Sequence, residues 1–216
     1  MFRALGAAGL ALALSGCAGI GQPAPYDSPG INGLVIPTPS ADPADFVDVV
    51  DNPWLALRPG ATWRYDVVGS GGTIGSIEAE VLDRTSTVAG LPATAVRTDA
   101  EVDGETSEVT RYYAQDDDGN VWLVGMDSSA GASWRAGTDG AEAGLAMPGD
   151  PRLGDGWVAY RLPDGDEAST TIEDQTAEQV QVRDEAGTTT RSVYEKGVGL
   201  VGVEDLDAGW TAVPRD

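Results

Sequence analysis

Carboxylates are the most abundant side chains in this sequence that can do chemistry. Asp and Glu together account for 35 of the 216 residues. One protonated and one ionised carboxylate are enough to hydrolyse a glycosidic bond. No spacing singles out such a pair, so a carboxylate-dependent, glycan-acting enzyme is the weakest of three functional hypotheses. Most of these acids are expected on a solvated surface.

The acidic turn that begins at Asp116 and ends at Asn120 suggests calcium, which prefers oxygen ligands. An EF-hand loop in this register would need an oxygen ligand at Ala114 and a glutamate at Gly125, and both are missing. A looser site formed by Asp116, Asp118 and Asn120 competes with a plain hairpin turn, which we favour. We therefore predict no metal site.

The sequence lacks the residues that other types of reaction require. The chain has no histidine, which excludes Ser-His-Asp and Cys-His catalysis and histidine-bearing zinc or haem sites. No phosphate-binding glycine loop stands between a strand and a helix. We predict no catalytic residue and no cofactor, and we do not expect an enzyme.

The single cysteine, Cys17, is the one residue to which we assign a modification. It follows a positive start at Arg3, an apolar stretch over 4–14 and two small residues, which together are typical of a secretory signal peptide. Leu14-Ser15-Gly16-Cys17 also resembles the lipobox of bacterial lipoproteins. The resemblance implies cleavage before Cys17, a diacylglycerol on its thiol and a further acyl chain, such as palmitate, on the new amine. Two or more chains anchor a protein firmly.

The expected organisation is therefore a signal peptide over 1–16, the lipidated Cys17 with a tether rich in Pro, Gly and Ala over 17–41, and one β-rich extracytoplasmic domain over 42–216. We expect it on the extracytoplasmic side of the cell membrane, held by the lipid. The formal net charge of −22 argues against nucleic acid and against anionic headgroups as partners.

One short N-terminal helix is predicted over 42–50. Asp42 is a suitable N-cap and Pro43 suits the first helical position. Phe46, Val49 and Val50 are spaced by three and four residues, as on one helix face. Pro53 would end the helix.

After Ala61 the apolar residues alternate, as in half-buried strands. Trp63, Tyr65 and Val67 set this pattern, and Asp103-Gly104 is a strong hairpin signal. The predicted strands cover 62–67, 74–82, 94–102, 105–114, 120–124, 157–162, 169–174, 178–183, 188–195, 198–204 and 210–213. Residues 128–156 are predicted to be irregular. The fold class is mainly β: a single antiparallel sheet, half-closed or barrel-like.

Several motifs resemble a family of uncharacterised bacterial secreted proteins. They are Asp51-Asn52-Pro53-Trp54-Leu55, the stretch from Leu57 to Tyr65, Tyr112-Tyr113-Ala114-Gln115-Asp116, the stretch from Asp118 to Trp122, and Gly197-Val198-Gly199-Leu200-Val201. The resemblance covers about residues 46–204 and implies export and a β fold, but no reaction. The closing strand is also similar to that of half-barrel lipoprotein carriers, which is an analogy of fold.

Two further functional classes are in competition. The first, which we favour, is a non-catalytic interaction or structural module of the cell envelope, whose protein partner is unknown. The second is a carrier or sensor of an apolar ligand inside a half-closed sheet. Large side chains on the concave face would indicate a solid core, whereas small ones such as Ala93, Ala95 and Ala100 would leave space.

Two residues are predicted to serve folding. Pro59-Gly60 is expected to turn the chain into the first long strand, with Gly60 at positive φ. Trp63 is expected to be the first large inward side chain of that strand. Trp122, Trp54 and Trp134 are also predicted to fill the core, although Trp54 and Trp134 lie in loop-like sequence where an aromatic ring could cover a cavity or stack on a sugar.

Overall fold

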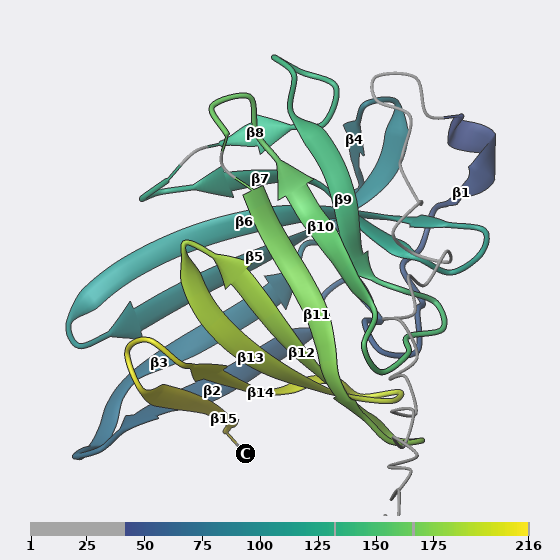
Figure 1. Ribbon diagram of the computed structural model, residues 1–216. Helices are drawn as coiled ribbons and strands as arrows, with labels where there is room; N and C mark the ends of the chain where they lie inside the picture. Colours follow the sequence, from purple (N-terminus) through teal and green to yellow (C-terminus); the bar gives the residue numbers. More distant parts are fainter. Residues whose placement is uncertain (1–41, 132, 166, 216) are drawn as a thin grey trace, which may run out of the picture.

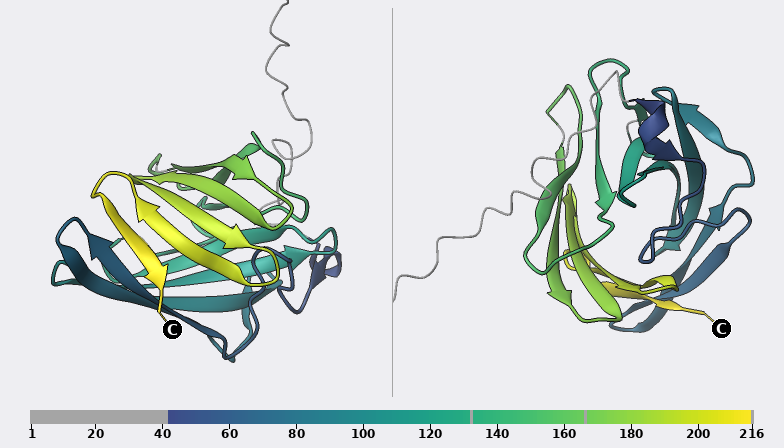
Figure 2. Two further views of the ribbon diagram at one scale, coloured as in Figure 1. Left: turned by 90° about the horizontal axis from the view of Figure 1, so that it is seen from below. Right: turned by 90° about the vertical axis from the view of Figure 1, so that its right-hand side faces the viewer.

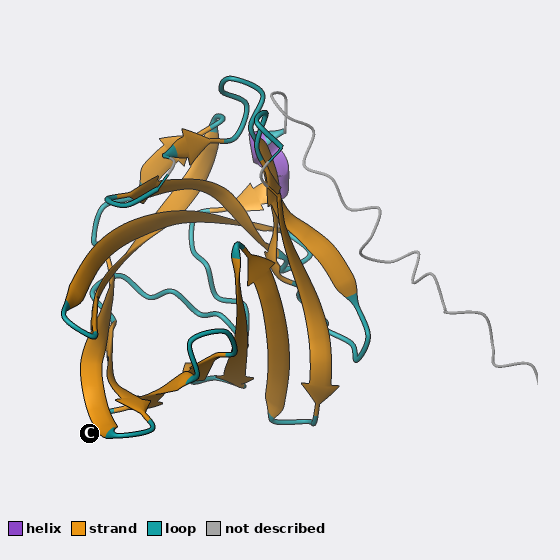
Figure 3. Ribbon diagram, turned by 60° about the vertical axis from the view of Figure 1, so that its left-hand side comes forward, coloured by secondary structure: helices purple, strands orange, loops and turns teal. Residues whose placement is uncertain are grey.

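The computed structural model describes residues 42–131, 133–165 and 167–215, where the regular elements are strands apart from one 3-10 turn (Figure 3). The predicted signal peptide, Cys17 and the tether lie outside these residues. In the part that is described, no helix is long and apolar enough to cross a membrane. The elements, in chain order, are η1 (Pro43–Asp45), β1 (Phe46–Val47), β2 (Thr62–Gly69), β3 (Gly72–Val81), β4 (Ser86–Val88), β5 (Leu91–Val102), β6 (Glu105–Asp116), β7 (Val121–Ser128), β8 (Trp134–Arg135), β9 (Glu142–Met147), β10 (Gly156–Arg161), β11 (Glu167–Gln175), β12 (Gln179–Ala186), β13 (Thr188–Glu195), β14 (Gly199–Asp205) and β15 (Trp210–Pro214).

The strands form one antiparallel sheet that curves back on itself (Figures 1 and 2). The order of hydrogen-bonded neighbours is β6-β5-β3-β2-β15-β14-β13-β12-β11-β10-β9-β7, and β7 then pairs with β6. The sheet is therefore ring-like, but it is not a barrel. The β9–β10 pairing holds at only two positions, Ala143 with Tyr160 and Glu142 with Arg161. The predicted single antiparallel sheet is confirmed.

The hairpin between β5 and β6 shows how local sequence sets the register. Asp103 and Gly104 both have positive φ, 51° and 81°, as a two-residue type I′ turn requires. The strands then pair without interruption from Val102 opposite Glu105 to Thr94 opposite Tyr113. Gly60 also has a positive φ, 76°, as predicted.

Residues 48–61, which we call the crossing segment, close one end of the ring. The Asn52 side-chain amide donates hydrogen bonds to the carbonyl of Gly119, in the β6–β7 turn, and to that of Pro148, directly after β9. The next residue, Pro53, accepts a hydrogen bond from Gly197 in the β13–β14 turn. The segment therefore spans from one wall of the ring to the other.

The interior of the ring holds two apolar clusters. The larger lies at the crossing segment and combines side chains from strands on both walls, including Val96 of β5, Trp157 of β10 and Val182 of β12. The smaller is centred on Tyr65, Val67 and Ala212. Partly buried Trp63 packs against both clusters, so its predicted inward position is confirmed.

The predicted helix over 42–50 is wrong beyond its first turn. Asp42 does cap a helical turn, accepting a hydrogen bond from the amide of Ala44, but the turn is 3-10 and ends at Asp45. Phe46 is already extended and, with Val47, pairs with the end of β6. A single turn fixes many dihedrals for few hydrogen bonds, so pairing with a neighbouring strand prevails.

The prediction of irregular structure over 128–156 is also wrong in part. This stretch contains β8 and β9, and β9 is the strand that joins β7 to β10 in the ring. Trp134 of β8 pairs with Met126 of β7. The many glycines and prolines of the stretch obscured two short strands, of which β8 has only two residues and β9 pairs with residues about 17–26 positions away.

Candidate functional site

The inward face of the sheet changes from apolar to polar along β11 and β12. On β12, buried Val180 and Val182 are followed on the same face by Asp184. On β11, Ile172 lies opposite Val182, and Thr170 lies opposite Asp184. The Thr170 hydroxyl donates a 2.7 Å hydrogen bond to the Asp184 carboxylate. A polar layer therefore follows the apolar core on this wall.

Arg111 of β6 comes to the same layer from the other side of the ring. It lies opposite Val96 of β5 and Met126 of β7, which both belong to or pack on the larger apolar cluster. Its charge lowers the pKa of Asp184, so the two side chains lie within electrostatic range. Because β6 and β12 are not neighbours in the sheet, this interaction acts across the interior.

Two tyrosines complete the layer: Tyr113 of β6, two residues beyond Arg111, and Tyr194 of β13. Burial raises the pKa of both phenols, and the charge of Asp184 adds to the increase. Burial is also the main cause that raises the pKa of Asp184, against the Thr170 hydrogen bond and Arg111, which lower it. We call Arg111, Tyr113, Thr170, Asp184 and Tyr194 the interior polar cluster.

The cluster has polar atoms with no partner in the fold. Within the described residues, Arg111 forms no hydrogen bond or ion pair, and the hydroxyls of Tyr113 and Tyr194 form no hydrogen bond. All three residues keep part of their surface accessible. None of these atoms is among the fully buried polar atoms that lack a partner. Since a fully buried, unpaired guanidinium would be very costly, we expect the Arg111 side chain to keep contact with water.

Tyr65 of β2 is a further buried tyrosine within electrostatic range of Tyr194. The Tyr65 hydroxyl donates a 2.8 Å hydrogen bond to the carbonyl of Leu200, and burial raises its pKa to about 12. The charge of an ionised Tyr65 also raises the pKa of Tyr194. The interior polar cluster thus brings one cation and one carboxyl group into electrostatic range of buried or partly buried tyrosines.

We predict that Asp184→Asn raises the free energy of unfolding at pH 7. The raised pKa of Asp184 means that its charge costs the native state stability above the folded pKa, and protonation removes that cost as the pH falls. The amide oxygen of the introduced asparagine would still accept the Thr170 hydrogen bond. Denaturant titrations should show a higher midpoint for the variant at pH 7 and a smaller difference near about pH 4, the ordinary pKa of aspartate. The exposed control Asp150→Asn should leave the midpoint unchanged; a lower midpoint for Asp184→Asn at pH 7 would show that the charge stabilises the fold.

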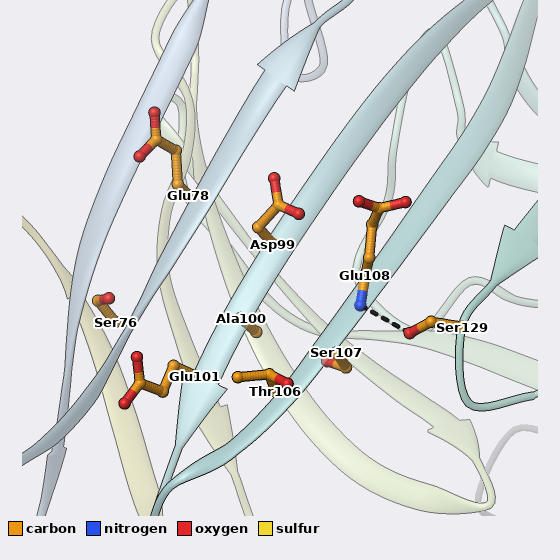
Figure 4. A pocket seen from close by; sticks show the side chains of 9 residues that line it. All are labelled: Ser76, Glu78, Asp99, Ala100, Glu101, Thr106, Ser107, Glu108 and Ser129. Atoms are coloured by element: carbon orange, nitrogen blue, oxygen red, sulfur yellow. Dashed lines mark hydrogen bonds between the residues drawn. The ribbon is translucent and has the colours of Figure 1, made fainter.

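A second feature is an acidic groove of about 530 Å³ on the outer face of β3, β5 and β6 (Figure 4). Glu78, Asp99 and Glu108 lie side by side on the three strands. Arg64 pairs with Glu78 at 2.8 Å and Arg97 with Asp99 at 3.2 Å, so part of this charge is neutralised. The groove is wide and exposed, and it fits a basic surface better than an anion.

The acidic turn is occupied by its own hydrogen bonds. The two carboxylate oxygens of Asp116 accept bonds from the amide and side chain of Asn120 and from the indole of Trp122. Asn120 in turn accepts from the amide of Gly149. In the described part of the chain, no three Asp, Glu, His or Cys side chains are grouped to hold a metal ion.

The small residues that were predicted to leave space on the concave face do not line a common cavity. Ala93 and Ala95 are buried, at 1% and 2% exposure, whereas Ala100 lies beside the acidic groove. The loop tryptophan Trp54 is buried and carries Lys196 over its ring at 5.5 Å; Trp134 is buried against Tyr160. Filling of the core is confirmed for both tryptophans.

Sequence reasoning missed every member of the interior polar cluster. The available signal was a charge at an inward position of a half-buried strand, as at Asp184 after Val180 and Val182. Arg111 shows the same signal, on the face of β6 that lies opposite Val96.

Comparisons with known proteins add little. A scan against protein-family models and a search of curated proteins gave no match. A solved structure of a candidate lipoprotein from Parabacteroides distasonis matches with a TM-score of 0.34 and 12% sequence identity, covering 74% of this chain and 95% of that one. The resemblance of residues 46–204 to a secreted family stays a prediction.

Proposed function

We propose that this chain is a non-catalytic binding protein, lipid-anchored through Cys17 on the extracytoplasmic side of the cell membrane, and that it binds a small polar ligand inside the ring. The observation that carries the proposal is the inward Arg111, whose side chain has no ion-pair partner among the described residues and lies within electrostatic range of Asp184. A charge held in a partly enclosed site without a partner lowers stability, and sites of this kind are typically retained for binding.

The same geometry is less suited to an apolar ligand. The larger apolar cluster fills the end of the ring at the crossing segment, and the next layer contains Arg111 and Asp184. A long acyl chain placed there would take these charges out of water without pairing them. A glycosidase is disfavoured too, because the groups that act on Asp184 are Thr170 and Arg111 and include no second carboxylate.

The test is the small-molecule content of the full-length chain isolated from membranes. Mass spectrometry of molecules released on denaturation should find a bound compound in the wild type. The compound should be depleted at least about tenfold in Arg111→Met, which loses the guanidinium but keeps a long side chain.

Arg64→Met is the matched control, because Arg64 lies on the outer face, half-exposed, in an ion pair with Glu78. It should retain the compound. Absence of any bound compound in the wild type, or equal amounts in both variants, would contradict the proposal. An apolar compound retained by Arg111→Met would support the carrier hypothesis instead.

A further inference from the structure

Arg111 differs from the other partly buried arginines of the described chain. The partly buried ones, Arg97, Arg135, Arg183 and Arg191, all pair with carboxylates at 2.8–3.7 Å. In a chain with a formal net charge of −22, a carboxylate partner is easily supplied. Within the described residues Arg111 has none, although it is only partly exposed and lies between Val96 and Met126 in the sheet.

Asp184 does not fill this role. Its Oδ1 accepts the Thr170 hydroxyl at 2.7 Å, and no ion pair joins it to Arg111. The cation and the carboxyl group are therefore within electrostatic range of each other but farther apart than a salt bridge. A molecule that binds both must have an acceptor at one end and a donor at the other.

The guanidinium of Arg111 determines which chemical group the ligand must carry at the end that binds it. It is planar, always charged and presents its N–H donors as a fork that matches carboxylate or phosphate oxygens. At the second end, Asp184 offers acceptor oxygens, or an O–H donor when protonated, and both suit a hydroxyl group. The hydroxyls of Tyr113 and Tyr194, which form no hydrogen bond within the described residues, add further donors and acceptors, and their rings provide flat apolar faces for carbon-bound hydrogens.

We infer that the interior polar cluster binds a small hydroxylated acid, whose carboxylate or phosphate pairs with Arg111 and whose hydroxyl hydrogen-bonds to Asp184. This inference rests on the proposed binding function and names its ligand class. A sugar acid and a sugar phosphate share the required chemistry.

Calorimetric titration of the full, detergent-solubilised chain with glucuronate, glucose 6-phosphate and glucose tests it. At least one of the two acids should bind at least about tenfold more tightly than glucose. The acid that binds identifies carboxylate or phosphate as the preferred group. Failure of both acids to bind, or equal binding of glucose, would overturn the inference.

Two variants connect the result to the site. Arg111→Lys keeps the charge but loses the fork, and it should weaken binding of the preferred acid at least about tenfold; Arg64→Met should not change it. Unchanged affinity in Arg111→Lys would place the binding elsewhere and overturn the inference. A neutral compound isolated with the wild-type chain and lost in Arg111→Met would leave the binding function intact and refute only the acid.

Discussion

Replacing Asn52 by alanine should reduce the free energy of unfolding by about 3–5 kcal/mol. The Asn52 side chain is 1% exposed and makes four hydrogen bonds. Its amide donates to the carbonyls of Gly119 and Pro148, and its oxygen accepts from the amides of Trp54 and Leu55. Each buried group left without a partner costs about 1–3 kcal/mol.

A domain is stable by about 5–15 kcal/mol in total, so the Asn52 variant should be marginal at room temperature. Denaturant titration measures the loss. Gln179→Ala, at an exposed position, is the control and should change the midpoint little. A loss below about 1 kcal/mol in Asn52→Ala would mean that water replaces the side chain and that the crossing segment does not depend on it.

Gly144→Ala should have an effect of similar size, about 3 kcal/mol or more, for a different reason. A Cβ at Gly144 would stand 2.3 Å from the carbonyl oxygen of Val158 and 2.5 Å from the carbonyl carbon of Ala159. These are backbone atoms of β10, which cannot rotate away. Because β9 and β10 pair at only two positions, we expect the ring to separate there first.

Gly71→Ala is the matched control, because nothing lies within 4 Å of its Cβ position. Thermal unfolding should show a large drop in Tm for Gly144→Ala and little change for the control. Hydrogen exchange should locate the faster-exchanging amides in β9 and β10. Equal Tm values for the two variants would disprove the close approach of the strands.

The parts of the fold that follow from local chemistry were predictable. Asp103-Gly104 has the two residues that a type I′ turn needs, and alternation from Trp63 to Val67 places alternate side chains inward. The strands that were missed, β1, β4, β8 and β9, are short or interrupted. Phe46, for example, is extended because Asp116 lies beside it, and no local pattern reports that partner.

The candidate site was harder to predict because its members are brought together only by closure of the ring. Arg111 and Asp184 lie on strands that do not pair, and their proximity follows from β7 meeting both β6 and β9. Each charge could be recognised as an inward residue of its own strand. That Arg111 and Asp184 lie in the same layer of the interior could not be recognised, because this depends on the order of all the intervening strands.

The measurement that tests the central claim most directly is the reactivity of Arg111 toward phenylglyoxal, an arginine reagent of small-ligand size. After exhaustive dialysis and brief modification, peptide mass spectrometry should find Arg111 modified together with the exposed Arg58 and Arg84. Arg183 and Arg191, which are held in ion pairs, should react more slowly. An unmodified Arg111 beside fully modified Arg58 and Arg84 would show that the interior is closed to small molecules and would contradict a binding site there.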